Sequence, residues 1–116
     1  FNIEDSTTIS YSVIDTTLHT LKTAQSVLIT DSPTVEFVLR GNTISSTSEG
    51  ALKFDAPTTA SCIDLSANAL SSANTFTDIE LINTLSLVDF ANLATNNMGA
   101  SIDAGAATVT DVVSCP

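Results

Sequence analysis

The chain has almost no positive charge. Among its 116 residues only Lys22, Arg40 and Lys53 are basic, against 13 acidic residues, so the formal net charge is −10. Nucleic-acid binding draws most of its affinity from basic side chains that neutralise phosphates. Attraction to anionic membrane surfaces needs the same side chains. The charge therefore argues against both kinds of partner.

Long apolar runs, aromatic residues and glycine are also scarce. The sequence has no run of about 18 apolar residues, so we expect no membrane span. It has no tryptophan, four glycines, and only 5% aromatic residues. Nevertheless, 43% of the chain is hydrophobic, which is too much for a disordered acidic segment. Mostly aliphatic side chains suit thin, regular layers rather than a bulky globular core.

The sequence carries no motif that specifies catalysis. It contains no nucleophile elbow, glycine-rich phosphate loop or His-x-x-x-His pair. The single histidine, His19, stands among threonines with no nucleophile close in sequence, and we interpret it as an exposed strand or turn residue. We therefore expect no catalytic residues and no enzyme activity.

What the chain does contain is a repeat. Three sets of apolar residues recur at a spacing of 26: Tyr11, Phe37 and Ile63; Val13, Leu39 and Leu65; Leu18, Ile44 and Leu70. A second block recurs at a spacing of 24 and matches Leu28 with Leu52. Such a period is typical of arrays in which each unit buries its apolar side by stacking on its neighbours. Within the units apolar and polar residues alternate, and this period of two indicates strands.

These patterns predict an all-β fold, a parallel β-solenoid of about four or five coils with a period of 23–26 residues. We expect one β domain over residues 1–116, with coils at approximately 1–26, 27–50, 51–76, 77–99 and 100–116. In the fourth coil Ile63 and Leu65 correspond to Val88 and Phe90, and Phe54 to Ile79. In the fifth, Ile79 corresponds to Ile102.

An antiparallel β-sandwich or jelly roll of about eight strands is the alternative. It also explains turn signals every 8 to 12 residues. It does not explain why an apolar-Asn-Ser-Ser pattern recurs at a constant distance. A direct bridge between the two cysteines would favour it.

The stacked coils, with Asn42, Asn68 and Asn92 at one corner, resemble the right-handed parallel β-helix proteins. That group includes pectin-degrading enzymes, phage tailspikes, and the passenger regions of adhesins and autotransporters. The resemblance implies a column of asparagines, which tolerate left-handed backbone and can bond one another along the stack. The paired Asp, Gly-His-Gly and Arg-Ile-Lys strings of polygalacturonases are missing, so the adhesin type fits better.

Acidic residues recur near two columns of the expected stack. Asp31, Asp55, Glu80 and Asp103 fall near one, and Asp64, Asp89 and Asp111 near another. Like charges about 5 Å apart repel one another. They are relieved by solvation or by sharing a hard cation such as Ca²⁺, or they form an acid pair for glycoside hydrolysis. We favour the solvated ladder, expect no cofactor, and keep calcium as the second interpretation.

Cys62 and Cys115 are an even pair, which predicts a disulfide in a secreted chain. In the solenoid, Cys62 should point outward and lie two coils, or about 10 Å, from Cys115. A disulfide needs Cα atoms within about 7 Å of each other. The C-terminal tail must then fold back, or the cysteines must join two subunits. Two unpaired thiols are the remaining possibility.

The composition, rich in Ser and Thr and poor in Lys, predicts an extracellular or cell-surface protein, and a first residue other than Met predicts a processed or excised chain. Uncapped solenoid ends expose strand edges that another copy can extend. The leading hypothesis is a self-assembling filament or appendage subunit, a homopolymer joined through its end coils by Phe1, Ile3, Val109, Val112 and Val113. A glycan- or receptor-binding segment of a larger adhesin is the second hypothesis, and an enzyme acting on polysaccharide the third.

Overall fold

The computed structural model describes the backbone of residues 2–4, 9–14, 17–20, 27–30, 35–56, 61–73 and 75–115, and the side chains of 36–55, 61–73 and 75–115. This part of the chain is mostly β. Its elements are β1 (Asn2–Glu4), β2 (Ile9–Ile14), β3 (Thr17–Thr20), β4 (Val27–Thr30), β5 (Val35–Arg40), β6 (Thr43–Ser46), β7 (Leu52–Ala56), β8 (Cys62–Ser66), β9 (Ala69–Ser71), β10 (Ile79–Val88), the 3-10 turn η1 (Phe90–Asn92), α1 (Leu93–Asn96) and β11 (Ile102–Val112).

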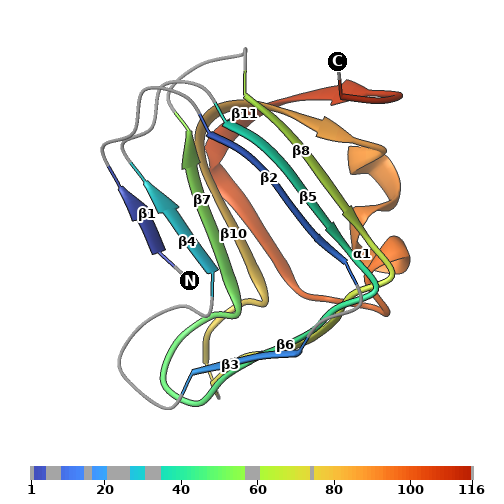
Figure 1. The fold of residues 1–116 in the computed structure, drawn as a ribbon. Helices are drawn as coiled ribbons and strands as arrows, with labels where there is room; N and C mark the ends of the chain where they lie inside the picture. The colour runs from blue at the N-terminus through green and yellow to red at the C-terminus, as the bar shows by residue number, and fades with distance from the viewer. Residues whose placement is uncertain are drawn as a thin grey trace.

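The strands come in successive sets, and each set pairs in parallel with the next (Figure 1). The first three sets are β1–β3, β4–β6 and β7–β9; the fourth is β10 with η1 and α1, and the fifth is β11. In the larger sheet, β1, β4 and β7 lead to the first half of β10, and β2, β5 and β8 lead to its second half. In the smaller sheet the order is β3-β6-β9. Because every ladder between described strands is parallel, the antiparallel sandwich is wrong for this part of the chain.

The spacing of 26 is confirmed as a pairing register. Phe37 pairs with Tyr11 on one side and with Ile63 on the other. Likewise, Ile44 pairs with both Leu18 and Leu70. In parallel strands, residues that pair have side chains on the same face. The repeat therefore stacks apolar residues over one another.

The spacing of 24 is wrong as a register. Val27, not Leu28, pairs with Leu52, and Leu28 pairs with Lys53. A slip of one residue moves every side chain of a strand to the opposite face. The spacing of 24 would thus have paired Ile29 with Lys53, whereas Ile29 pairs with the buried Phe54.

The predicted correspondences in the fourth set are wrong by one or two residues. Leu87, not Val88, pairs with Ile63. Phe54 pairs with Leu81, and Ile79 pairs with Leu52. The predicted match of Ile79 with Ile102 is confirmed.

The core lies between the sheets and is continuous from the second set to the fourth. Phe37 and Phe54 meet edge to face with ring centroids 5.7 Å apart, which joins the two halves of the larger sheet. Aliphatic side chains fill the space around them. The largest fully buried ones are Leu39, Ile44, Leu52, Ile63, Leu65, Ile79, Leu81, Leu85 and Leu87.

The fourth set departs from the pattern after β10. Asp89 has a left-handed backbone, with φ 52°, and η1 and α1 follow where a fourth strand would continue the smaller sheet. Phe90 was predicted to pair in the column of Leu39 and Leu65, but it lies in η1 and packs against the core from there. Leu93 of α1 is buried. No described helix is long and apolar enough to cross a membrane.

Candidate functional site: the free edge of β11

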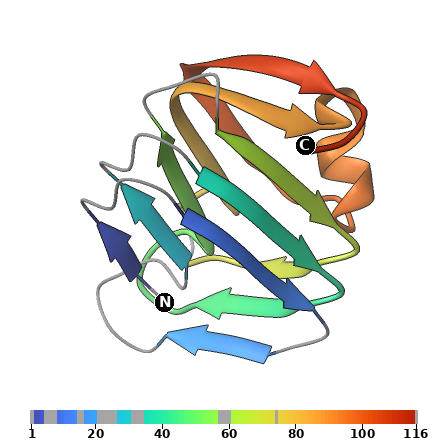
Figure 2. The same ribbon diagram turned by 45° about the horizontal axis from the view of Figure 1, so that its top comes forward.

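β11 is an edge strand in the described structure. It pairs with β10 and with no other described strand. Figure 2 shows it, in orange-red, at one edge of the stacked strands, with the blue N-terminal strands at the opposite edge. An unpaired strand edge presents free N–H and C=O groups to another chain.

The edge is regular over only part of its length. The register shifts between Glu80 and Ile82, so β11 bulges near Gly105, whose N–H donates to Asp103 Oδ1 at 3.0 Å. Bulges are one means by which proteins blunt sheet edges. From Ala106 to Val112 the pairing with β10 is unbroken. These seven residues, 106–112, form the usable edge.

The direction of the free backbone groups follows from one hydrogen bond. Asp89 N–H donates to Val112 C=O at 3.0 Å, so the backbone polar groups of Val112 point toward β10. Successive residues of a strand point these groups to alternate sides. Ala107, Val109 and Asp111 therefore direct their N–H and C=O groups to the free edge.

The predicted assembly residues of the C-terminal end lie at this edge or beside it. Val109 is half-buried and packs against the core, and Val112 is also half-buried. Val113 is 97% exposed. Ile3 lies in β1 and pairs with Ile29 at the opposite end of the strand order, but its side chain is outside the described part. Phe1 lies outside the described residues.

A disulfide joins this end of the chain to β8. Cys62 and Cys115 are bonded within the chain, with Cα atoms 5.6 Å apart. The expected separation of about 10 Å is wrong because the tail after β11 turns back past β10, the strand between β11 and β8. Cys62 is buried. The short bridge thus coexists with parallel strands and does not favour the sandwich.

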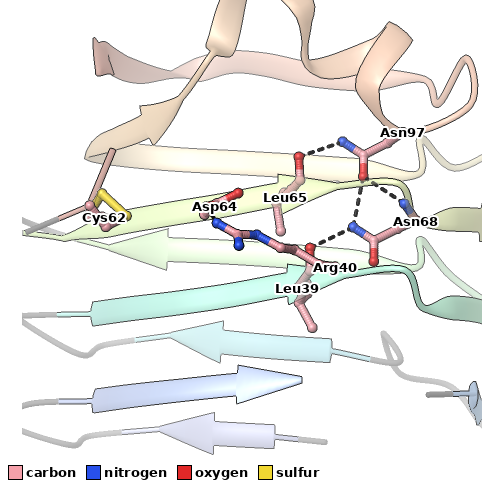
Figure 3. A network of polar contacts seen from close by, with 8 residues as sticks. Leu39, Arg40, Cys62, Asp64, Leu65, Asn68 and Asn97 are labelled. Carbon is pink, nitrogen blue, oxygen red and sulfur yellow. Dashed lines mark hydrogen bonds and ion pairs between the residues drawn. A yellow bond between two sulfur atoms is a disulfide. The ribbon is translucent and has the colours of Figure 1, made fainter. Parts of the chain in front are cut away.

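A column of three buried asparagines, Asn42, Asn68 and Asn97, supports the corner next to α1. Figure 3 shows Asn68 and Asn97 of this column. Asn42 Nδ2 donates to Asn68 Oδ1 at 3.1 Å, and Asn68 Nδ2 donates to Asn97 Oδ1 at 2.8 Å. Asn68 Nδ2 also donates to Leu39 C=O, and Asn97 Nδ2 donates to Leu65 C=O. Together these bonds tie the helical turn to the second and third sets.

The predicted third member of this column, Asn92, is wrong. Asn92 is exposed in η1 and donates from Nδ2 to Asp89 Oδ1 at 2.8 Å. The turns η1 and α1 add residues after β10, so Asn97 reaches the column 29 residues after Asn68 rather than 24. No repeated pattern marks the insertion, because Asn97 shares no flanking motif with Asn68.

Asp64, one of the predicted calcium ligands, is paired with a cation of this chain. Arg40 Nη2 donates to Asp64 Oδ2, and Asp64 is only 8% exposed (Figure 3). That hydrogen bond, followed by the charge of Asp64, raises the pKa of Arg40 above its usual value. Arg40 therefore neutralises a carboxylate that is largely removed from water.

In the first predicted acidic column only Glu80 and Asp103 pair with each other; Asp55 pairs with Ile82, and Asp31 lies outside the described residues. The second column is wrong, because Asp64 pairs with Val38 and Asp111 with Leu87, while Asp89 lies in the turn after β10.

Glu80 lies between Lys53 and Asp103 in the register, and its Oε2 is 3.2 Å from Lys53 Nζ. Asp55 accepts from Asn83 Nδ2. Asp89 accepts from Asn92 and from Asn96 Nδ2, the latter at 2.8 Å. Within the described residues, no three His, Cys, Asp or Glu side chains form a group that could hold a metal. Calcium stays a prediction.

Two surface depressions lie near the C-terminal sets. One, of about 530 Å³, is lined by Asp89, Asp111, Val112 and Val113 at the end of β11. The other, of about 300 Å³, includes Lys53, Glu80, Asp103 and the half-exposed ring of Phe76. The first depression adjoins the free edge and so belongs to the same candidate site.

Comparisons of the chain with protein-family models, with curated proteins and with solved structures each gave no match.

Proposed function

We propose that the chain is a parallel β-solenoid resembling the right-handed β-helix proteins, and that it is an extracellular structural subunit that assembles through strand edges. The parallel register supports the fold proposal, because each strand of one set pairs with its counterpart in the next. The buried asparagine column supports it as well. A solenoid has two ends, and each end is a strand edge unless something covers it.

The observation that carries the functional proposal is the free edge at residues 106–112. Its outward N–H and C=O groups can accept a further strand in the way that β10 accepts β11. Behind the edge, Ala107 and Val109 are only half-buried, although they pack against the core. An added strand would cover them, so backbone pairing and apolar burial favour the same contact.

The disulfide supports both the location and the assembly. Disulfides persist in oxidising compartments, which agrees with an extracellular or cell-surface protein. Cys115 lies three residues after β11, and its bond to Cys62 anchors the end of the edge strand to β8. An anchored edge loses little conformational entropy when a partner strand binds.

One observation favours the second candidate, a glycan- or receptor-binding segment. Phe76 is 49% exposed and lines a depression together with Lys53 and Glu80. An exposed aromatic ring beside polar groups is a common feature of ligand sites. Loss of glycan binding in a Phe76→Ala variant that still assembles would support this function.

Two separate proline variants, at neighbouring positions of β11, test the edge proposal. Ala107→Pro removes an N–H that points to the free edge, whereas Thr108→Pro removes one that points to β10. We expect Ala107→Pro to keep the melting temperature close to that of the parent chain and to reduce self-association. Thr108→Pro should lower stability by about 1–3 kcal/mol, because it removes the donor of a ladder bond and leaves the acceptor on β10 without a partner.

Sedimentation velocity over a range of concentrations, with negative-stain microscopy, measures the association. A parent chain that remains monomeric at high concentration contradicts the proposed function. Unchanged assembly of Ala107→Pro would show that the joint lies elsewhere than at this edge.

A further inference from the structure

We infer that two copies of the chain join tail to tail: β11 of one copy pairs antiparallel with β11 of the other, about a two-fold axis through Val109. The inference rests on the proposed function and specifies its partner and geometry. It follows from the position of Asp111 and from the symmetry of the regular edge.

Asp111 opposes head-to-tail stacking. Phe37 pairs with Ile63, Ile63 with Leu87, and Leu87 with Asp111. Asp111 thus occupies the end of a column whose other described members are buried and apolar. Its carboxylate is exposed here and accepts from Phe90 N–H at 3.0 Å.

A second copy that added its N-terminal strands in the same parallel register would place Tyr11 next in this column, because Tyr11 pairs with Phe37 at the other end. Asp111 would then lie inside a continuous apolar layer without a cation in register. Burial of an unpaired carboxylate costs several kcal/mol. Inward-facing charges are a recognised means of preventing such edge pairing.

Antiparallel pairing avoids this burial. The regular segment runs from Ala106 to Val112, so its midpoint is Val109. A two-fold axis there places Ala107 opposite Asp111 of the second copy, and Thr108 opposite its Thr110. The carboxylate then faces a methyl group at the margin of the interface, where water still reaches it.

The backbone groups satisfy the same register. Val109 faces its own counterpart, and Ala107 faces Asp111, all with N–H and C=O directed outward. The Thr108–Thr110 pairs fall at the closer, non-hydrogen-bonded positions, where threonines pair favourably across strands. Because paired residues point to one face, the half-buried side chains of both copies lie on the same side.

Charge distinguishes this register from a nearby one. With the axis at Ala107, Asp103 of one copy would face Asp111 of the other, and like charges directly opposite are destabilising. With the axis at Val109, no acidic residue of β11 faces another. The bulge near Gly105 also keeps pairing from extending toward Asp103.

Cysteine cross-linking tests the geometry. Three variants are made in the oxidised parent chain: Thr108→Cys, Thr110→Cys and Ser10→Cys. Ser10 pairs with Glu36, which leads through Cys62 and Ser86 to Thr110, so head-to-tail stacking would bring Ser10 against Thr110 of the next copy. Thr43→Cys, exposed on β6, is the control. Mixtures are oxidised mildly, and peptide mapping identifies the new disulfides.

The tail-to-tail joint predicts a mixed disulfide between T108C and T110C chains. Its yield should exceed that of either homodimer by about tenfold, because directly opposite Cα atoms lie about 4.5 Å apart and diagonal ones about 7–8 Å. Products between T110C and S10C chains would overturn this inference and leave the proposed function standing. An assembling parent chain without the T108C–T110C product would also overturn it. A monomeric parent chain refutes the proposed function itself.

Discussion

Asn97→Ala tests the corner on which the C-terminal sets depend. The Asn97 side chain is 1% exposed. Its Nδ2 donates to Leu65 C=O at 3.0 Å and to Leu93 C=O at 2.9 Å. Its Oδ1 accepts from Asn68 Nδ2 at 2.8 Å and from Asn68 N–H at 3.3 Å. Removing the side chain withdraws all four bonds from a site that is closed to water.

The expected loss of stability follows from the buried polar groups that Asn97→Ala leaves without a partner. Leu93 C=O still accepts from Asn97 N–H, and Asn68 Nδ2 still donates to Leu39 C=O. Leu65 C=O, Asn68 N–H and one Nδ2 hydrogen of Asn68 lose a partner. At about 1–3 kcal/mol for each of these three buried unsatisfied groups, the loss is about 3–9 kcal/mol. Small domains have total stabilities of about 5–15 kcal/mol, so the variant should be severely destabilised.

Asn92→Ala is the matched control, because Asn92 is the residue that the repeat pattern assigned to this column. It is exposed and bonds one oxygen of Asp89, whose other oxygen accepts from Asn96. We expect a loss below about 1 kcal/mol. Urea unfolding followed by circular dichroism, under oxidising conditions, compares the two variants. Equal losses, or a larger loss for Asn92→Ala, would refute the corner assignment.

Further variants test the disulfide near the end of the chain and the Arg40–Asp64 ion pair on the surface of β8. The double variant Cys62→Ala/Cys115→Ala should lose about 4 kcal/mol of unfolding free energy, since the bridge closes a loop with a sequence separation of 53. Denaturation of the oxidised parent chain and of the variant measures this difference. A difference below about 1 kcal/mol would argue against the bridge. Arg40→Ala should lower the melting temperature more than Lys53→Ala, because Asp64 is buried while Glu80 stays partly exposed. The reverse order in calorimetry would count against a structural role for the Arg40–Asp64 pair.

The register of strand pairing could be predicted where the same order of apolar and polar residues recurs. Phe37 and Ile63 were matched correctly because each lies five residues before an asparagine and eight before a pair of serines, and only a parallel register aligns all of these at once. The match of Leu28 with Leu52 failed although the local sequences are similar. Resemblance over a few residues does not determine which face of a strand is buried, whereas the apolar column next to it does.

The site was predictable in outline only. The valines at the end of the chain were identified from the expectation that a last coil has a free edge. The role of Asp111 was not, because its place in the column depends on how β10 pairs with both β8 and β11. Asn97 was missed for a similar reason: the helical turns between Asp89 and Asn97 increase the number of residues that separate Asn97 from Asn68.

The β character, the parallel stacking of like residues and the column of asparagines could all be predicted from the order of the amino acids. Each of these follows from short-range alternation or from a spacing that repeats, and such patterns are visible without coordinates. Three features emerged from the folded chain alone: the register of the second block, the third asparagine of the column, and the return of the tail that brings Cys115 to Cys62. These depend on bulges, left-handed residues and a tail that folds back, each of which shifts the chain by a few residues where no repeat records it.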